Sequence, residues 1–590
     1  MEGKSNSSRI SSKTSQVLVQ PLDDSKIRNL LHTLEDLVKS SLGPSGRLKF
    51  FQTSGGGHVT VTSSSSKILH SLSGLSHPIS RLILSAVRGH LDAYNDGGLR
   101  TALLMLSLIQ SAIDMQIPRV LVTQIFEHSL EVLSDHLESC HWKMKMDIGH
   151  MKSMMSVVNS IIGTKSACHL SESEKQYISV LLIKAFLQSL PSKTCKDSSC
   201  SPLAPLPVQI VTCEGDPVNE SKILLGVLLQ APDIPTFRQN KTLVSPAAKV
   251  ALYNVSMAGD TDEWFSDSVK TEATMFRHDA NIESATVRQM LKVADWLIST
   301  GVAVIACQKC VHPAVKQYLR DKGALVIDRV SIVHITAVQR LTGAVLLSTF
   351  TMDIPVSNFG QLERIEHMVL NNKSYIHLFP QPSLKSSPVC TLVLCAPDET
   401  SLEELKTVCQ ASIIALHETL KQPYVFPGAG CLDTHLASVL RMYGKNCSSE
   451  KSRDLGCSKG QIISVINNVA LCLESLAKCL EHDGGIEITD SANHHHWSLS
   501  PGALELKPSM PYCMCGLVSH DHSLEWSMMG EMITNTSFGN GDKCCTGNSN
   551  KLFDNVVVDI YSMKINSYRI AFETANAILR IQCIVNSNVV

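Results

Sequence analysis

The stretch VAVIACQKCVHPAVKQYLRDKGALVID, residues 302–328, decides the fold of the middle of this chain. It holds two short apolar runs with β-branched residues, 302–306 and 324–328, separated by a segment of helical spacing. A third such run, AVLLS at 344–348, follows a second helix-like segment, ITAVQRLTG. Strands that alternate with helices are typical of a parallel sheet covered by helices. We therefore predict an α/β layer at the centre of the chain.

The two ends of the chain are predicted to be mainly helical. Residues 24–42 place apolar side chains at steps of three and four, with Asp24 or Ser25 as the candidate cap, and GPSG would stop that helix. The segment HVTVT that follows alternates like a strand. Beside Ile578, the last helix carries one stripe that should face the core, made of Tyr568, Phe572, Ala575, Leu579 and Gln582. Helical ends around an α/β centre suggest one helical domain into which the centre is inserted.

Composition excludes several classes of function. The chain has 590 residues, which is too long for one compact core, and its net charge of −2 offers no basic field for nucleic acid or for an acidic membrane. A polar, Ser-rich start and the lack of an apolar run of about 18 residues predict a soluble, intracellular protein. The 20 cysteines lie scattered in apolar segments, which indicates buried free thiols in a reducing compartment.

Several motifs connect the chain to a known family. The pieces GPSGRLK, HVTVTSSSSKIL, LSHP, CQKCVHPAVKQYLRDKGALVIDRV and ETANAILRI occur in this order and at spacings that resemble the group II chaperonin subunits of the eukaryotic cytosol. The resemblance runs over nearly the whole chain. It implies an α/β multidomain fold with a mainly helical equatorial domain, which holds nucleotide, an intermediate domain, and an α/β apical domain, which grips client protein.

The resemblance also implies domain boundaries. Within the second equatorial segment, residues 491–550 are rich in Ser, Asn, Gly, His and Cys and are expected to be an irregular, partly disordered insertion. Such an insertion could lie where subunits meet, so the sequence leaves ring formation open, as it does the order of an apical lid at 261–279. The predicted segments are a disordered tail at 1–20, equatorial parts at 21–150 and 412–590, intermediate parts at 151–218 and 376–411, and the apical domain at 219–375.

The resemblance places a nucleotide site in the equatorial domain, and this sequence keeps part of it. Gly43, Pro44 and Gly46 match a family loop whose backbone approaches phosphate, although the same residues also suit an ordinary turn. The family's Gly-Asp-Gly-Thr-Thr motif is represented by Asn-Asp-Gly-Gly-Leu at 95–99. Asp96 and Gly97 persist while both hydroxyls are lost. Asp96 is therefore the expected magnesium ligand, with weakened binding.

Three further residues complete the predicted nucleotide site. Gly428 and Gly430 remain from the family's triple-glycine loop, and Asp559 falls where the family has an acidic residue near the ribose and base. We therefore expect that ATP or ADP with magnesium could be bound without being hydrolysed. The alternative is that these residues are remnants that serve only the equatorial core.

Two residues that hydrolysis requires in this family are replaced. Ser64 stands where the family has the Asp of a Thr-Asn-Asp-Gly turn, and Ala411 stands where it has a water-activating Asp. The segment CQASII around Ala411 holds no acid within one or two residues. General-base assistance is worth about 10²–10⁴-fold, so the chain is predicted not to be an active ATPase.

Two cysteine patterns raise the question of redox or metal chemistry. Cys307 and Cys310 form a CxxC, but no second CxxC follows at zinc spacing and the segment matches a family strand end that has no redox role. The insertion holds many candidate ligands, but their irregular spacing and the usual solvation of loop histidines disfavour zinc. These ligands are His494, His495, His496, Cys513, Cys515, His520, His522, Cys544 and Cys545.

The degenerate motifs and the insertion resemble the chaperonin-like proteins tied to Bardet–Biedl syndrome. That resemblance implies an ATPase-deficient assembly factor for the ciliary cargo coat called the BBSome, acting in cilium biogenesis in the cytoplasm and at the centrosome or basal body. Its implied partners are other chaperonin-like Bardet–Biedl proteins, cytosolic chaperonin subunits and BBSome subunits, with no nucleic acid and no membrane insertion. An active folding ATPase and a structural centrosomal protein remain the alternatives.

Overall fold

The computed structural model separates the chain into two compact units. Unit 1 contains Met1–Ser171 and Thr407–Val590, and unit 2 contains Glu172–Lys406. The finer division into equatorial, intermediate and apical segments stays a prediction. The structure describes residues 16–52, 59–75, 77–140, 142–190, 208–230, 242–244, 248–258, 282–381, 389–447, 449–480, 486–490, 494–499, 512–519, 524–529 and 556–586.

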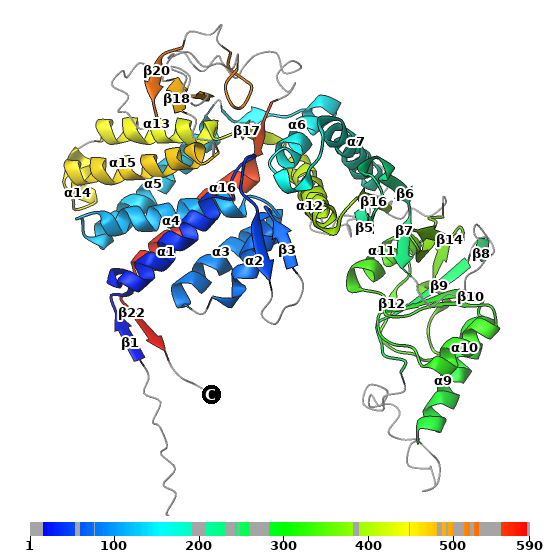
Figure 1. Ribbon diagram of the computed structural model, residues 1–590. Coiled ribbons are helices and arrows are strands. Elements are labelled where there is room, and N and C mark those ends of the chain that lie inside the picture. The colour runs from blue at the N-terminus through cyan, green and yellow to red at the C-terminus, as the bar shows by residue number, and fades with distance from the viewer. Residues whose placement is uncertain are drawn as a thin grey trace, which may run out of the picture. The chain divides into compact units, whose positions relative to one another are not determined.

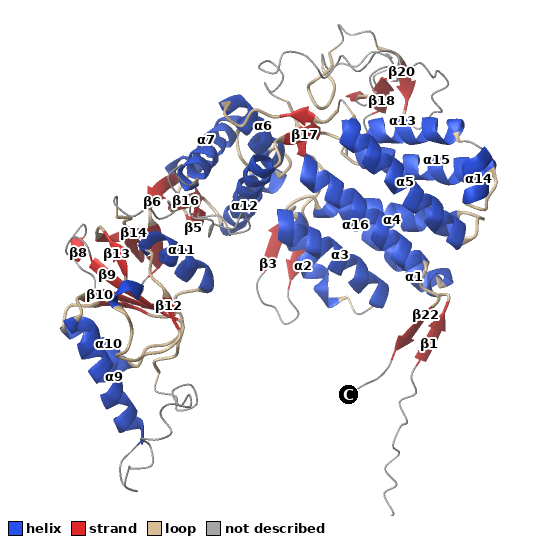
Figure 2. Ribbon diagram, turned by 180° about the vertical axis from the view of Figure 1, so that it is seen from behind, coloured by secondary structure: helices blue, strands red, loops and turns tan. Residues whose placement is uncertain are grey.

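Unit 1 is mainly helical (Figure 2). The second part of unit 1 begins within α12 (Glu399–Lys421), the helix that carries Ala411. The helices of the first part are α1 (Ser25–Lys39), α2 (Ser65–Ser71), α3 (Pro78–Tyr94), α4 (Gly98–Asp114), α5 (Arg119–Ser139) and α6 (Met151–Ile162). Those of the second part are α13 (Cys431–Asn446), α14 (Ser449–Asp454), α15 (Lys459–Lys478) and α16 (Tyr561–Leu579).

One hydrophobic core joins the two ends of the chain, which Figure 1 colours blue and red. Helix α4 packs against α1 from the same end and against α15 and α16 from the other. Phe126 of α5 meets Phe572 of α16 edge to face, with ring centroids 6.1 Å apart. The predicted stripe on α16 is buried except for Gln582, which is exposed because the helix ends at Leu579. By length and composition α15 could cross a membrane, but it lies in this core.

The first predicted elements form where the sequence placed them. Helix α1 begins at Ser25, and the Asp24 carboxylate accepts a hydrogen bond from the Lys26 backbone at 2.8 Å, so Asp24 is the cap. The GPSG segment ends in a turn in which the Gly46 N–H donates to the Gly43 carbonyl at 3.1 Å. The alternating segment forms β3 (Val59–Thr62), which pairs with β2 (Lys49–Gln52).

The prediction of a disordered tail over 1–20 is wrong for its last residues. Strand β1 (Gln16–Val19) pairs antiparallel with β22 (Cys583–Asn586), with Val17 opposite Val585. Val-Leu-Val has high strand propensity and finds its partner at the opposite end of the chain, which local composition cannot reveal. Residues 1–15 lie outside the described residues.

A small sheet in unit 1 brings distant segments together. Its central strand β17 (Tyr424–Pro427) pairs with β4 (Met144–Lys145) and with β21 (Val558–Ile560). Asp559 lies in β21 directly opposite Phe426. The glycine loop at 428–430 follows β17 and leads into α13, so this sheet fixes both Asp559 and the start of that helix.

The insertion is more regular than its composition predicts. Strands β18 (Ile486–Asp490), β19 (His496–Leu499) and β20 (Trp526–Met528) form a three-stranded sheet. Trp497 is buried, and its ring lies edge to face with that of Trp526, with centroids 4.7 Å apart and an angle of 80° between the ring planes. These aromatic side chains join the hydrophobic core of unit 1, which the Ser-, Asn- and Gly-rich composition of the insertion does not reveal. The prediction of an irregular segment over 491–550 is therefore wrong for the strands β19 and β20, whereas residues 512–519 form turns and a single bridge.

Unit 2 contains the predicted α/β layer. Its parallel strands run in the order β11 (Leu325–Ile327), β10 (Val302–Cys307), β9 (Ala248–Tyr253) and β12 (Leu346–Leu347), and β13 (Gly360–Leu362) pairs with β9 antiparallel. Alternate residues of β9 and β10 enter different cores. One face is covered by α11 (Ile332–Thr342), and the other by α9 (Ile282–Ser299) and α10 (Pro313–Asp321). Burial of both faces explains the continuously apolar strands.

Two further sheets complete unit 2, which also contains α7 (Glu172–Ser189). One has the order β7 (Val227–Gln230), β15 (Lys373–Leu378), β14 (Ile365–Leu370) and β8 (Thr242–Val244). The other places β16 (Cys390–Ala396) between β5 (Val208–Glu214) and β6 (Lys222–Leu225). The lid segment at 261–279 lies outside the described residues.

Candidate functional site

A cavity of about 140 Å³ lies in unit 1 beside the starts of α4 and α16. Four of the eight predicted nucleotide-binding residues line it: Gly43, Asp96, Gly97 and Asp559. They come from the turn after α1, the turn before α4 and the strand before α16. The folding of distant segments around one cavity thus brings together half of the predicted site.

The start of α4 gives the cavity a site suited to an anion. Gly97 caps this 17-residue helix at φ +75, a backbone conformation that favours glycine. A Cβ at Gly97 would lie 2.9 Å from Nε2 of His90. Burial lowers the pKa of His90 to about 4, so its imidazole is neutral at pH 7. Free N–H groups at a helix N-terminus attract negative charge, as in phosphate-binding loops.

Both carboxylates of the cavity wall are paired with lysines. Nζ of Lys165 lies 3.4 Å from Oδ1 of Asp96, and Nζ of Lys564 lies 2.8 Å from Oδ2 of Asp559. Arg100 adds a third cation to the wall. The side chains that line the cavity thus include three cations and two carboxylates, and Asp433 behind the wall balances the third cation.

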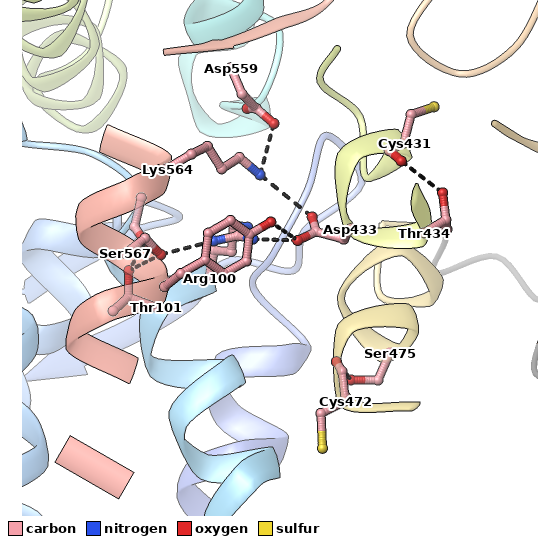
Figure 3. A network of polar contacts seen from close by, with 12 residues as sticks. Arg100, Thr101, Cys431, Asp433, Thr434, Cys472, Ser475, Asp559, Lys564 and Ser567 are labelled. Atoms are coloured by element: carbon pink, nitrogen blue, oxygen red, sulfur yellow. Dashed lines mark hydrogen bonds and ion pairs between the residues drawn. The ribbon is translucent and has the colours of Figure 1, made fainter. Parts of the chain in front are cut away.

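A buried carboxylate on α13 organises two of these cations (Figure 3). Asp433 accepts hydrogen bonds from the guanidinium of Arg100 and from the hydroxyl of Tyr568, the latter at 2.6 Å, and lies 3.5 Å from Nζ of Lys564. Burial by itself would raise the pKa of Asp433, but the two cations outweigh it and lower that pKa. Asp433 is thus ionised, and it joins the starts of α4, α13 and α16.

The other predicted residues do not line the cavity. Pro44 is exposed, and Gly46 turns back toward the backbone of Ser41. Gly428 packs against Val557, and Gly430 packs against Ala477 and His496. The triple-glycine loop therefore packs against protein groups rather than opening into the cavity.

The two positions predicted to lack catalytic acids are both buried. Ser64 is 2% exposed, and its backbone N–H donates to the Thr62 hydroxyl at 3.0 Å; Ala411 is 2% exposed on α12. The carboxylates that line the cavity belong to Asp96 and Asp559, and each has a lysine partner. Each of these carboxylates is therefore engaged by a cation rather than held free to accept a proton from water.

The donor set of the cavity fits a phosphate group better than the magnesium ion that would accompany it. Magnesium prefers octahedral oxygen ligands, usually carboxylates with water and phosphate. Here Asp96 offers one carboxylate that Lys165 already neutralises, and the lost hydroxyls are replaced by Gly98 and Leu99. Lys165, Arg100 and Lys564 would instead hold phosphate oxygens by charge.

Both cysteines of the CxxC pattern are free thiols in the structure. Cys307 ends β10 in the core of unit 2, where its thiol lies 3.3 Å from the Val255 carbonyl oxygen. Burial raises the pKa of Cys307 to about 12, which disfavours the reactive thiolate. Cys310 precedes α10, at whose start Nδ1 of His312 accepts a hydrogen bond from the Ala314 N–H at 3.2 Å.

Sequence reasoning missed the residues that set the charge of the cavity. Arg100 follows directly after the altered 95–99 motif, so a cation beside lost hydroxyls was the available signal. Lys165 and Asp433 carried no local signal, because their partners lie far away along the chain. Lys564 lies one turn into α16 after Asp559, a spacing too common to single out.

Comparison with known proteins places the chain among chaperonins. The family model described as the TCP-1/cpn60 chaperonin family matches residues 34–588. The protein called molecular chaperone MKKS is 30% identical in Mus musculus over 579 residues, which cover 97% of this chain and 98% of that protein. Its Homo sapiens counterpart is 29% identical and covers 96% and 97%. Thermosome subunit alpha of Sulfurisphaera tokodaii is 22% identical over 77% of this chain and 78% of its own.

These matches confirm two predictions from the sequence. The motifs and the insertion predicted similarity to the McKusick–Kaufman syndrome protein, and the relatives named MKKS match nearly end to end. The α/β multidomain chaperonin fold follows from the family match together with the helical and α/β units. The chain belongs to the TCP-1/cpn60 chaperonin family.

Proposed function

We propose that this chain is a chaperonin-like assembly factor that binds protein subunits without an ATP hydrolysis cycle. The observation that carries the proposal is the state of the acids at the cavity. Ser64 and Ala411 stand where the family needs carboxylates, and Lys165 and Lys564 pair with the two carboxylates of the wall. A family member with such a site keeps protein binding as its remaining activity.

The resemblance extends the proposal to the complex that is assembled and to its place in the cell. Similarity to the proteins named molecular chaperone MKKS supports assembly of the BBSome for cilium biogenesis, together with other chaperonin-like Bardet–Biedl proteins and the cytosolic chaperonin. The proposed locations are the cytoplasm and the centrosome or basal body. ATP or ADP is proposed as a bound ligand that is not turned over, held by the three cations of the cavity.

ATP turnover by the purified full chain tests the first half of the proposal. We expect a rate at least about 10²-fold below that of an ordinary group II chaperonin, because general-base assistance is missing. Phosphate release is measured beside the Ser64→Asp/Ala411→Asp double variant and beside a positive control chaperonin. Nucleotide binding is measured in parallel with and without magnesium, and we expect little dependence on the ion.

A further variant distinguishes ATP turnover at this cavity from turnover by a contaminating ATPase. Lys564→Met removes a cation from the cavity wall, so genuine turnover at this site would change in that variant, whereas a contaminating ATPase would not. Brisk hydrolysis that responds to Lys564→Met would overturn the proposal in favour of an active folding subunit.

Partner binding tests the second half, at an exposed apolar pair in unit 2. Ile332 and Val333 lie in the first turn of α11, and their exposed fractions are 67% and 68%. This helix lies in the predicted apical segment. We expect Ile332→Asp/Val333→Asp to weaken capture of BBSome subunits by about tenfold or more, since loss of a hot-spot side chain costs about 2 kcal/mol or more.

The matched control lies in unit 1. Val120 is in the first turn of α5 and is 66% exposed, so Val120→Asp changes a similar surface far from the predicted apical segment along the chain. Circular dichroism verifies that both variants fold. Equal capture by both variants and the unmodified chain would favour the structural centrosomal protein.

A further inference from the structure

Four metal-ligating side chains of unit 1 converge on one point. They are Cys431 at the start of α13, His495 before β19, and Cys513 and Cys515 from the segment between β19 and β20. Their ligand atoms all lie within 4.8 Å of one another, and all four side chains are buried. Sγ of Cys515 lies 3.2 Å from Sγ of Cys513 and 3.2 Å from Nδ1 of His495.

We propose that Cys431, His495, Cys513 and Cys515 form a structural zinc site that fastens the insertion sheet to the first turn of α13. Three thiolates and one imidazole are a common closed set for structural zinc, which is tetrahedral. Zinc–sulfur bonds of about 2.3 Å set the ligand atoms of such a tetrahedron about 3.8 Å apart. The cluster is compact enough to meet that geometry with small movements of its side chains.

A disulfide does not account for the cluster. The two sulfurs of Cys513 and Cys515 are 3.2 Å apart, whereas a disulfide bond is about 2.05 Å long. The three cysteines also pack in the hydrophobic core of unit 1, but core packing by itself does not require that their sulfurs and an imidazole nitrogen meet at one point. Coordination would convert the thiols to thiolates and supply the compensating charge.

The surroundings hold the ligands as a metal site requires. The Val518 N–H donates to Sγ of Cys513 at 3.2 Å, and the turn is closed by Cys513 N–H to the Val518 carbonyl at 2.7 Å. Gly516 adopts φ +84 within this turn. The ring of Trp142 stacks on the imidazole of His495, with centroids 4.7 Å apart and an angle of 26° between the planes, and this contact fixes the imidazole plane. Such supporting contacts orient the ligands and stabilise thiolate charge.

The site would hold the glycine loop at 428–430 in contact with the insertion. Cys431 directly follows Gly430, where a Cβ would lie 3.1 Å from Cε1 of His496. The Thr434 hydroxyl of α13 donates to the His494 carbonyl at 2.8 Å, and the Val557 N–H donates to the Cys515 carbonyl at 3.0 Å. Zinc would therefore hold the glycine loop at 428–430 against the insertion, away from the cavity.

The spacing argument against zinc considered only ligands inside the insertion, whereas one ligand of the proposed site lies outside it. Cys431 belongs to the segment that follows β17, so the set is completed only in the folded chain. The insertion residues His520, His522, Cys544 and Cys545 lie outside the described residues. His494 and His496 are neighbours of the cluster rather than members of it.

Metal analysis of the purified full chain tests the proposal. After dialysis against a weak chelator, the unmodified protein is expected to retain about one zinc per chain, as for a closed structural site. Cys431→Ser and Cys513→Ser should lose that zinc. His495→Cys should retain it, because four cysteines also form a zinc set. Cys472→Ser, a buried cysteine of α15 outside the cluster, is the matched control and should keep the metal.

Cobalt substitution keeps the test decisive if a variant misfolds. The unmodified chain loaded with Co²⁺ should show the intense visible bands of tetrahedral thiolate coordination, and His495→Cys should shift them. Retention of zinc by Cys431→Ser would overturn the proposal. So would a folded, metal-free protein that binds neither zinc nor cobalt, or cobalt spectra without thiolate bands, which would indicate adventitious metal on surface histidines.

Discussion

Asp433→Ala is expected to lower the free energy of unfolding by about 3–5 kcal/mol, the usual cost of breaking a buried ion pair from one side. The carboxylate is 2% exposed and compensates both Arg100 and Lys564. Its removal leaves Arg100 without its carboxylate partner and Lys564 with Asp559 alone, and it also leaves the Tyr568 hydroxyl without its acceptor. The change should appear as a large drop in the melting temperature and in the denaturation midpoint of the full chain.

An exposed aspartate of the same unit provides the control for this prediction. Asp92→Ala removes a carboxylate from the exposed side of α3 and should change stability by less than about 0.5 kcal/mol. If Asp433→Ala melted like Asp92→Ala, the network would not stabilise the unit. A phosphate-bearing ligand should raise the melting temperature of Asp433→Ala more than that of the unmodified chain, because it would supply the negative charge that the two cations lost.

Glu474→Ala is expected to cost a similar amount, about 3–5 kcal/mol, between α13 and α15. Both carboxylate oxygens of Glu474 accept from the guanidinium of Arg441, with Nη2 to Oε2 at 2.8 Å. Each side chain is 7% exposed, so neither charge recovers water when its partner is removed. Denaturation monitored on the full chain measures the effect.

Two comparisons define what the Arg441–Glu474 pair contributes. The paired replacement Arg441→Met/Glu474→Leu should be close to neutral, because apolar residues of similar size avoid the unpaired charge. Glu418→Ala breaks the more exposed pair with Lys421 and should cost less than about 1 kcal/mol. A double replacement as damaging as Glu474→Ala would show that packing, rather than charge, explains the loss.

Periodicity predicted the elements whose information is local. The steps of three and four in 24–42 gave α1, and the apolar runs of 302–328 gave β10, α10 and β11. The strand at 16–19 and the sheet of the insertion were missed, because each depends on a partner remote in sequence. Hydrophobic spacing indicates which face of a segment is buried, but it does not indicate which other segment packs against that face.

The same limit explains which part of the candidate site was found. Gly43, Asp96, Gly97 and Asp559 belong to motifs that the family places at nucleotide, so resemblance located them. The cations that neutralise Asp96 and Asp559 come from segments outside those motifs. Charge balance in a cavity is a property of the folded chain, and only the structure reveals that its acids are already occupied.

The pairing of β1 with β22 sets an order for biosynthesis. Because the core of unit 1 draws on residues from Leu22 to Ile584, it cannot close until nearly the whole chain has left the ribosome. Unit 2, residues 172–406, emerges earlier as a continuous stretch and can fold as it appears. Until then the apolar faces of α1 to α5 remain uncovered. Synthesis of the remaining residues takes roughly half a minute to a minute or more. The nascent chain is itself a client for protection against aggregation.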